Sequence, residues 1–334
     1  MSAFTTFRRP AVRLLPLALL GLLATSCSDD SDSDPDAPDT ITFTQSALYP
    51  EGVQYDASNN RFLVGSQTRG TVGQVKDDGT YSAFAEDAQL VSTIGLNVDD
   101  ARSRVLVAIS DPGYNTARTT AATKGKLAAV AIFNLTNGQR IDYVNLSSLR
   151  PDAAGHFAND IAVDGQGNVY VTDSFAPIIY KIDAQGTATV FLENNQLAAP
   201  AGAFGLNGIV YHPDGYLLVA KSDEGALFKV PISTPASFTK VTTSVNLKGA
   251  DGLLLRDNTT LLAVANAQST VYRLTTTDGW ASTTSSGTFT TPAVYPTTLA
   301  RRGSDAYVLY SHLNALQMNQ QPPVSEFTIQ EVDF

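Results

Sequence analysis

The stretch NDIAVDGQGNVYVTDS, residues 159–174, contains two short apolar runs separated by a polar turn. The second run, VYVT at 169–172, consists mostly of β-branched and aromatic residues, which is typical of a strand. Asp164 and Gly165 supply the turn chemistry between the two runs. The stretch therefore predicts a pair of antiparallel strands joined by a tight turn.

Five further segments have the same form. They are EGVQYDASNNRFLVGS (51–66), IGLNVDDARSRVLVAIS (94–110), NGIVYHPDGYLLVAKS (207–222), DGLLLRDNTTLLAVAN (251–266) and TTLARRGSDAYVLYSH (297–312). Successive copies start 43, 65, 48, 44 and 46 residues apart. A repeat of about 40–50 residues with several short strands is the signature of a β-propeller. We expect an all-β, six-bladed β-propeller over residues 41–334, closed by pairing of 41–43 with 327–329; a solenoid is the alternative.

The spacing of 65 residues exceeds the others because of an insertion, DPGYNTARTTAATKGK at 111–126. This segment shows no strand pattern. Long connections inside compact domains are usually functional. We expect it to lie on one face of the propeller, as a lid over a site or as a decorative loop.

One column of the repeat is rich in polar side chains. Its first position holds, in order, Glu51, Ile94, Asn159, Asn207, Asp251 and Thr297. Equivalent positions of the inner strands would surround the axis of a propeller. Two carboxylates and two carboxamides suit a hard cation, and Ca²⁺ is expected because it accepts oxygen ligands in flexible geometry. The predicted metal ligands are Glu51, Asn159, Asn207 and Asp251; Mg²⁺, Mn²⁺ or non-thiolate zinc are alternatives, as is a local role in turns.

The composition excludes several classes of protein. Hydrophobic residues make up 43% of the chain and charged residues 16%, which allows a large core and argues against a disordered chain. The net charge of −10 argues against nucleic-acid binding. A single cysteine excludes a disulfide framework and any site of several thiolates, and three histidines argue against a site of several imidazoles.

The N-terminus has the features of an export signal. Residues 1–26 contain arginines, then the apolar run 14–23, then small residues. LLATSC (22–27) resembles a bacterial lipobox, which implies that Cys27 is lipidated; an ordinary signal peptide is the alternative. Residues 27–40 are acidic and nearly devoid of apolar side chains, so we expect a flexible linker. These features predict a bacterial outer-membrane or cell-surface lipoprotein that touches the membrane only through its lipid.

Several stretches resemble the gluconolactonase and regucalcin-like propellers. They are YPEGVQYD (49–56), FANDIAVDGQGNVYVTDS (157–174), LNGIVYHPDGYLLVA (206–220) and ADGLLL (250–255), and the resemblance extends over about residues 48–312. It implies a six-bladed propeller that hydrolyses lactones or phosphotriesters. It also implies a metal held by Glu51, Asn159, Asn207 and Asp251, the same four residues as the polar column.

The resemblance also implies roles in catalysis. The cation would polarise the carbonyl or phosphoryl oxygen, and Asp251 would be the base or nucleophile as well as a ligand. Members that act on sugar lactones carry an arginine where this chain has Phe157. We therefore expect a more apolar substrate, bound by Phe157, Ile94, Thr297 and His156.

His312 ends the second strand of the last repeat and could act as a catalytic proton shuttle near the metal; a structural role is the alternative. The leading interpretation is a metal-dependent hydrolase of lactone or ester substrates on the cell envelope. The alternative is a non-catalytic propeller that binds a ligand or partner and holds a structural cation. We expect a small-molecule substrate, no nucleic acid, and a monomer.

Overall fold

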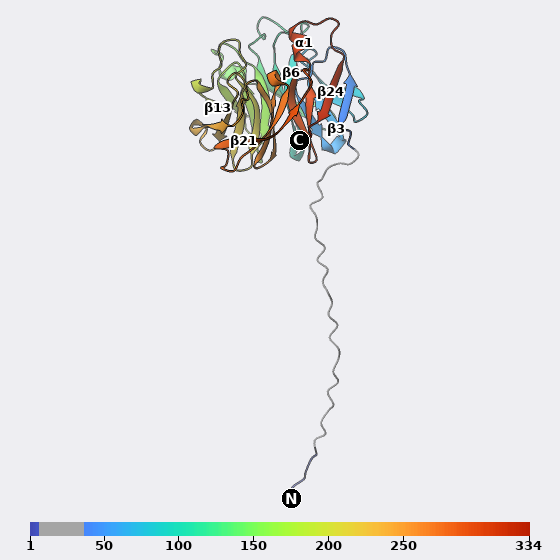
Figure 1. The fold of residues 1–334 in the computed structure, drawn as a ribbon, viewed down its shortest axis with the longest axis vertical. Coiled ribbons are helices and arrows are strands. Elements are labelled where there is room, and N and C mark those ends of the chain that lie inside the picture. The colour runs from blue at the N-terminus through green and yellow to red at the C-terminus, as the bar shows by residue number, and fades with distance from the viewer. Residues whose placement is uncertain (7–36) are drawn as a thin grey trace. The chain divides into compact units, whose positions relative to one another are not determined.

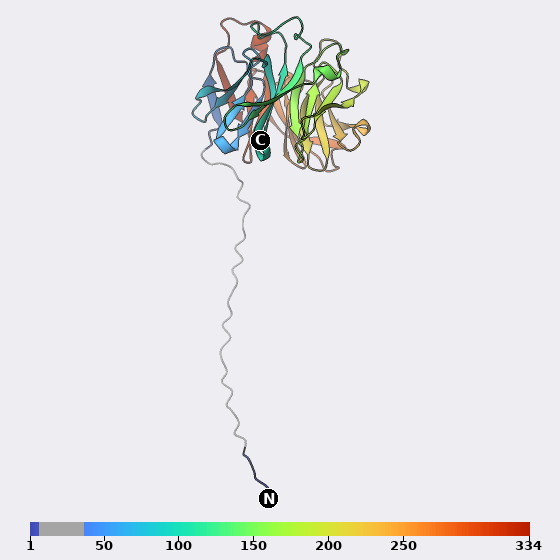
Figure 2. The same ribbon diagram turned by 180° about the vertical axis from the view of Figure 1, so that it is seen from behind.

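The computed structural model describes residues 1–6 and 37–334, and its strands all lie between residues 40 and 331 (Figures 1 and 2). The expected signal peptide, the lipidated Cys27 and most of the acidic linker concern residues 7–36 and lie outside the described part. Within the described part, no helix is long and apolar enough to cross a membrane.

The strands form six four-stranded antiparallel units. Unit one contains β2 (Val53–Asp56), β3 (Arg61–Val64), β4 (Thr71–Val75) and β5 (Tyr81–Glu86). Unit two contains β6 (Ser92–Asp99), β7 (Arg104–Ser110), β8 (Ala128–Asn134) and β9 (Arg140–Asn145). Unit three contains β10 (Ala158–Val163), β11 (Val169–Asp173), β12 (Ile178–Ile182) and β13 (Ala188–Glu193).

The second half of the chain repeats this order. Unit four contains β14 (Leu206–His212), β15 (Tyr216–Lys221), β16 (Ala226–Pro231) and β17 (Thr239–Thr243). Unit five contains β18 (Ala250–Asp257), β19 (Thr260–Ala265), β20 (Thr270–Thr275) and β21 (Ser282–Thr290). Unit six contains β22 (Pro296–Arg302), β23 (Asp305–Tyr310), β24 (Glu326–Glu331) and β1 (Thr40–Thr44). The short helix α1 (Leu313–Gln317) lies at one end of the strands, at the top in Figure 1.

The units are arranged in a closed ring. The first strands of neighbouring units contact one another in the order β2, β6, β10, β14, β18 and β22, and β22 contacts β2 again. Unit six is completed by β1, which pairs with β24 from Ile41↔Ile329 to Phe43↔Phe327. The expected pairing of these two strands is thus confirmed. The arrangement is that of a β-propeller, in which closure protects the strand edges.

One connection departs from the regular pattern. β17 and β21 pair in parallel through Thr242↔Ser282 and Thr243↔Thr283, which joins units four and five into one eight-stranded sheet. β21 has nine residues, more than any other strand, so its first residues extend past β20 and reach β17. The repeat pattern gave no indication of this pairing.

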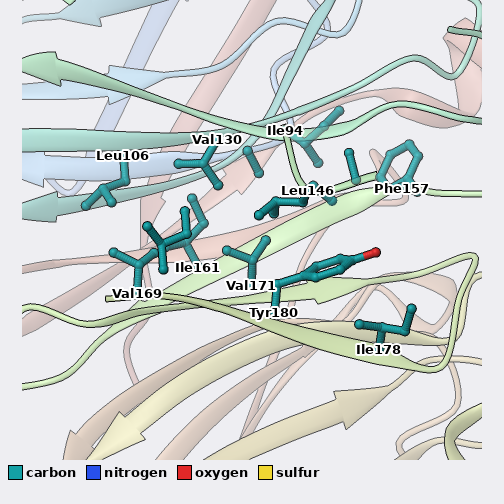
Figure 3. Packing of buried hydrophobic residues seen from close by; sticks show 14 of the residues in the cluster. Ile94, Leu106, Val130, Leu146, Phe157, Ile161, Val169, Val171, Ile178 and Tyr180 are labelled. Atoms are coloured by element: carbon teal, nitrogen blue, oxygen red, sulfur yellow. The ribbon is translucent and has the colours of Figure 1, made fainter. Parts of the chain in front are cut away.

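The core lies between neighbouring units. Figure 3 shows the cluster between units two and three, where Ile94 and Leu106 pack with Ile161, Val171 and Tyr180. Five similar clusters fill the other interfaces around the ring. Burying a Val, Leu or Ile side chain fully contributes about 1.5–3 kcal/mol, so these clusters hold the inner strands at fixed positions around the axis.

Candidate functional site

Two connected hollows occupy the axis of the ring in the described part. The larger is a cavity of about 580 Å³ that opens to solvent. The smaller has a volume of about 10 Å³, which is the space of a single water or ion. Four residues line both hollows: Glu51, Asn159, Asn207 and Asp251. These are the four predicted metal ligands, and they come from four different units.

Irregularities in the inner strands position three of these side chains. The strand register shifts between Ala158 and Ile161 in β10, between Leu206 and Ile209 in β14, and between Ala250 and Leu253 in β18. Each shift encloses one predicted ligand. Such β-bulges re-aim a side chain and are frequent next to active sites. Glu51 lies outside this pattern, two residues before the start of β2.

Packing explains why a glycine follows the first position of several repeats. A Cβ on Gly52 would lie 2.3 Å from the carbonyl oxygen of Ile94, and one on Gly95 would lie 2.3 Å from that of Asn159. A Cβ on Gly208 would lie 2.2 Å from the carbonyl oxygen of Asp251. In each case the neighbouring unit's first residue approaches the glycine backbone. The recurring X-Gly pattern therefore allows the ring to close tightly around the axis.

The carboxyl groups of the small hollow have perturbed acidity. Burial raises the pKa of Glu51 well above its ordinary value, and the charges of Asp251 and Asp160 raise it further. Burial raises the pKa of Asp251 to about 7, against hydrogen bonds from Asn266 and Asn207 that lower it. Burial likewise raises the pKa of Asp160 to about 7. Shifts of this kind cluster at functional sites.

The donor set fits a hard cation. No lysine, arginine or histidine is among the described residues that line the small hollow, so its crowded carboxylates have no positive partner there. Among the described residues, no three acidic, histidine or cysteine side chains are close enough to hold a metal by themselves. A cation would therefore need the carboxamide oxygens of Asn159 and Asn207 beside the carboxylates of Glu51 and Asp251.

Both carboxamides are held by serines at the end of the next strand of their own unit. Asn159 donates through Nδ2 to Ser174 Oγ at 2.9 Å, and Asn207 donates through Nδ2 to Ser222 Oγ at 3.0 Å. Because each amide nitrogen is engaged, each Oδ1 remains available to a ligand. Asp251 is held in the same way, since Asn266 donates to its Oδ2 at 2.8 Å.

These serines also join neighbouring units. The Ser174 hydroxyl donates to the carbonyl of Leu206, the residue before Asn207, at 2.6 Å. The Ser222 hydroxyl donates to the carbonyl of Ala250, the residue before Asp251. Hydrogen bonds and the intervening backbone thus connect Asn159 to Asp251 across three units. We call Ser174 and Ser222 the serine links.

Asp160 belongs to the site although the sequence interpretation did not include it. It lines the small hollow, and its Oδ2 accepts from the backbone N–H of Ile209 at 3.1 Å, across the interface between units three and four. Its Oδ1 accepts from the N–H of Ile161 at 2.8 Å. The sequence carries no signal for Asp160, because regular strand alternation would point it away from Asn159, and the register shift between Ala158 and Ile161 departs from that alternation.

The two non-ligand members of the polar column do not reach the cavity wall. Ile94 is fully buried in the cluster between units two and three. Thr297 is fully buried and donates through Oγ1 to the carbonyl of Glu51 at 2.7 Å, which joins unit six to unit one. Neither residue lines a described hollow, so the structure does not bring these two predicted substrate contacts to the site.

The two predicted site histidines also lie away from the cavity lining, whereas Phe157 is part of it. His156 is buried and contacts Asp173 through Nδ1 at 2.7 Å. His312 precedes α1 with a left-handed backbone, and its ring packs edge-on against Phe327 at 5.9 Å. Burial lowers the pKa of His312, partly offset by the charge of Glu326.

The insertion at 111–126 forms part of the cavity wall. Asp111, Pro112, Tyr114, Lys124 and Gly125 line the large cavity. The segment is also firmly anchored. A single guanidinium nitrogen, Nη1 of Arg118, donates to the carbonyls of Gly70, Asp87 and Leu90 at 2.6–2.9 Å.

No protein-family model matches the sequence, and no curated protein matches it significantly. Among solved structures, the fold is similar to Mala s 1, a major allergen of Malassezia sympodialis (TM-score 0.71, 18% identity, 89% of this chain and 96% of that chain). It is also similar to a luciferin-regenerating enzyme (TM-score 0.61, 13% identity, 88% and 96%). A third similar structure is a gluconolactonase of Xanthomonas campestris (TM-score 0.59, 14% identity, 88% and 89%). The resemblance to gluconolactonase-like propellers is thus confirmed at the level of the fold.

Proposed function

We propose that this protein is a six-bladed propeller hydrolase that uses a divalent cation, with Ca²⁺ as the first choice, to cleave lactone or ester substrates. Counting each four-stranded unit as a blade gives the six blades. One observation carries the proposal: Glu51, Asn159, Asn207 and Asp251 meet between a substrate-sized cavity and an ion-sized hollow. A gluconolactonase among the similar folds agrees with this chemistry.

The four ligands would hold the cation, and the cation would supply Lewis-acid polarisation of the substrate carbonyl. Asp251 is the candidate base or nucleophile, because its carboxylate lines both hollows and Asn266 fixes its orientation by donating to Oδ2 at 2.8 Å. As a base, Asp251 would accept a proton from water while the water oxygen bonds to the carbonyl carbon. When the ester C–O bond then breaks, Asp251 would return this proton to the leaving oxygen, so that the products are the carboxylic acid and the alcohol. The position of His312, with its ring packed against Phe327, does not support the predicted role as a proton shuttle.

We also propose that residues 1–26 are removed as a signal peptide and that Cys27 carries the lipid. We further propose that the propeller is a monomer and is displayed on the bacterial outer membrane or cell surface. Metabolic labelling of the full chain with a fatty-acid probe should label the wild type and leave Cys27→Ala unlabelled.

The test of the proposed function is hydrolysis by residues 37–334 on a panel of lactones, aryl esters and phosphotriesters, with Ca²⁺ and with chelator. We expect Ca²⁺-dependent turnover that Asp251→Asn lowers by at least about 100-fold, in line with the loss of a general base. Asp257→Asn is the matched control, because Asp257 ends the same strand at an exposed position. Ca²⁺ binding without turnover on the whole panel would favour the non-catalytic ligand-binding propeller instead.

A further inference from the structure

Three phenylalanine rings form one side of the large cavity. Phe157, Phe175 and Phe204 all line it, and each ring contacts the other two at centroid distances of 5.1–5.2 Å. The rings are tilted or perpendicular to one another. Such an arrangement presents both edges and faces, which is how aromatic rings receive a further ring. We call these three residues the aromatic wall.

Phe204 is notable for its exposure. This residue retains 41% of its accessible surface, whereas Phe157 retains 2%. Because Phe204 also lines the cavity, this exposed apolar surface is available to a ligand. The chain also fixes its position, because the N–H of the following residue, Gly205, donates to the carbonyl of Ser174 at 2.9 Å.

A buried carboxylate holds the backbone of the other two phenylalanines. Asp173 is fully buried, and its Oδ1 accepts from the backbone N–H of Phe157 at 2.8 Å and of Phe175 at 3.0 Å. Its Oδ2 is bound by His156 Nδ1 at 2.7 Å and by the Tyr180 hydroxyl at 3.1 Å. The backbone of Phe157 and Phe175 is therefore fixed before a ligand binds, which lowers the entropic cost of binding.

The aromatic wall lies next to the candidate metal ligands along the chain. Phe157 precedes Asn159 by two residues, and Phe175 directly follows Ser174, whose hydroxyl holds the Asn159 carboxamide. The aromatic wall and the four candidate ligands also line the same cavity of about 580 Å³, so one small molecule could contact both. The three rings offer no polar atom to a hydroxylated sugar ring.

We propose that the aromatic wall is a subsite for an aryl group carried beside the scissile carbonyl, so that the preferred substrates are aryl esters or benzo-fused lactones. This inference rests on the proposed function for the position of the carbonyl. The aryl group would pack against Phe175 and Phe204 while the carbonyl oxygen faces the side of the cavity formed by Asn159. A polyhydroxylated lactone would lose its hydration at this wall without gaining hydrogen bonds.

Two measurements test the inference with matched compounds. The first is the binding of 2-tetralone, a carbocyclic ketone with the shape of the benzo-fused lactone dihydrocoumarin, and of its saturated counterpart 2-decalone, by isothermal titration in Ca²⁺. The second is the hydrolysis of dihydrocoumarin, of δ-valerolactone and of glucono-δ-lactone. The variants are Phe204→Leu and Phe175→Leu, which keep an apolar side chain. Phe191→Leu is the control, because Phe191 packs on Tyr170 and does not line the cavity.

We expect Phe204→Leu to weaken 2-tetralone binding by about 2- to 13-fold and to raise the KM for dihydrocoumarin by a similar factor. Binding of 2-decalone, the KM for δ-valerolactone and all values for Phe191→Leu should be unchanged. Equal effects on the aromatic and saturated compounds, or glucono-δ-lactone as the best substrate, would overturn the inference and leave the hydrolase intact. Selective 2-tetralone binding without any hydrolysis would overturn the proposed function and keep the aromatic subsite.

Discussion

At the scale of single residues, the surroundings of His156 favour its charged form. Its Nδ1 lies 2.7 Å from the Asp173 carboxylate and its Nε2 lies 2.9 Å from the carbonyl oxygen of Arg150. A neutral imidazole has one N–H, whereas the imidazolium has two and satisfies both acceptors. Burial lowers the pKa of His156, but the hydrogen bond and the charge of Asp173 outweigh it, so that its pKa is raised overall.

This pair predicts a pH-dependent contribution to stability. Because the folded pKa of His156 is raised, its stabilisation is fully present below the unfolded value near 6.5 and is lost as pH rises through the folded pKa. We expect His156→Gln to lower the free energy of unfolding by about 2 kcal/mol at acidic pH and by less at about pH 9. Urea unfolding at both pH values measures the difference.

His312→Asn is the control for that experiment. The pKa of His312 is lowered by burial, so its contribution has the opposite sign: the charged ring is disfavoured in the folded state, and stability is lost as pH falls. Asn tolerates the left-handed backbone at this position, where φ is 55°. A loss for His156→Gln that is equal at the two pH values would contradict the charged pair.

At the scale of the elements, the serine links predict that the contacts between neighbouring units affect the affinity for a cation. Ser174→Ala and Ser222→Ala each free a carboxamide to rotate, and we expect Ca²⁺ affinity to fall by about 10- to 100-fold, as for other residues that orient metal ligands. Titration calorimetry on the wild type and both variants measures the change.

Ser110→Ala is the matched control. The Ser110 hydroxyl makes the same bond between units, to the carbonyl of Ala158 at 2.9 Å, but no predicted metal ligand donates to it. We expect it to lose stability like the other two variants and to retain Ca²⁺ affinity. A wild type that binds no cation would refute the metal site itself, whereas equal affinities in all variants would refute only the role of the serine links.

The sequence predicts the elements better than their contacts. The paired strands follow from the repeat. So do the four residues that share the axis, because equivalent positions of a closed ring must converge; they are Glu51, Asn159, Asn207 and Asp251. Asp160 could not be found this way, because its pKa depends on burial and on hydrogen bonds from the backbone N–H groups of Ile161 and of Ile209, which belongs to another unit. Ile94 and Thr297 occupy the same column of the repeat. However, Ile94 packs into the core and Thr297 bonds to Glu51 between units six and one, and both placements depend on local packing.

At the scale of the whole molecule, the ring is closed by β1. Ile41 and Phe43 of this strand are about 1% exposed, and they pack with the core between units six and one. Removing residues 1–46 would expose the edge of β24 and delete both side chains from the core. Since each buried side chain contributes about 1.5–3 kcal/mol, we expect a loss of roughly 3–6 kcal/mol together with aggregation.

A chain that starts at residue 37 is the comparison for this deletion, because it retains all of β1. Thermal unfolding and gel filtration of the two chains measure the effect. A chain from residue 47 that melts like the one from residue 37 and remains monomeric would show that the other units hold the ring without β1.

The spacing between each predicted metal ligand and the residue that orients it has a consequence for how such a site evolves. Asn159 and Ser174, Asn207 and Ser222, and Asp251 and Asn266 are each separated by fifteen residues. Duplication of one ancestral segment would therefore copy a ligand position together with the partner that orients it. New chemistry at the axis would then require only point substitutions within pairs that are already in register. Descendants could exchange one reaction for another while the scaffold stayed the same.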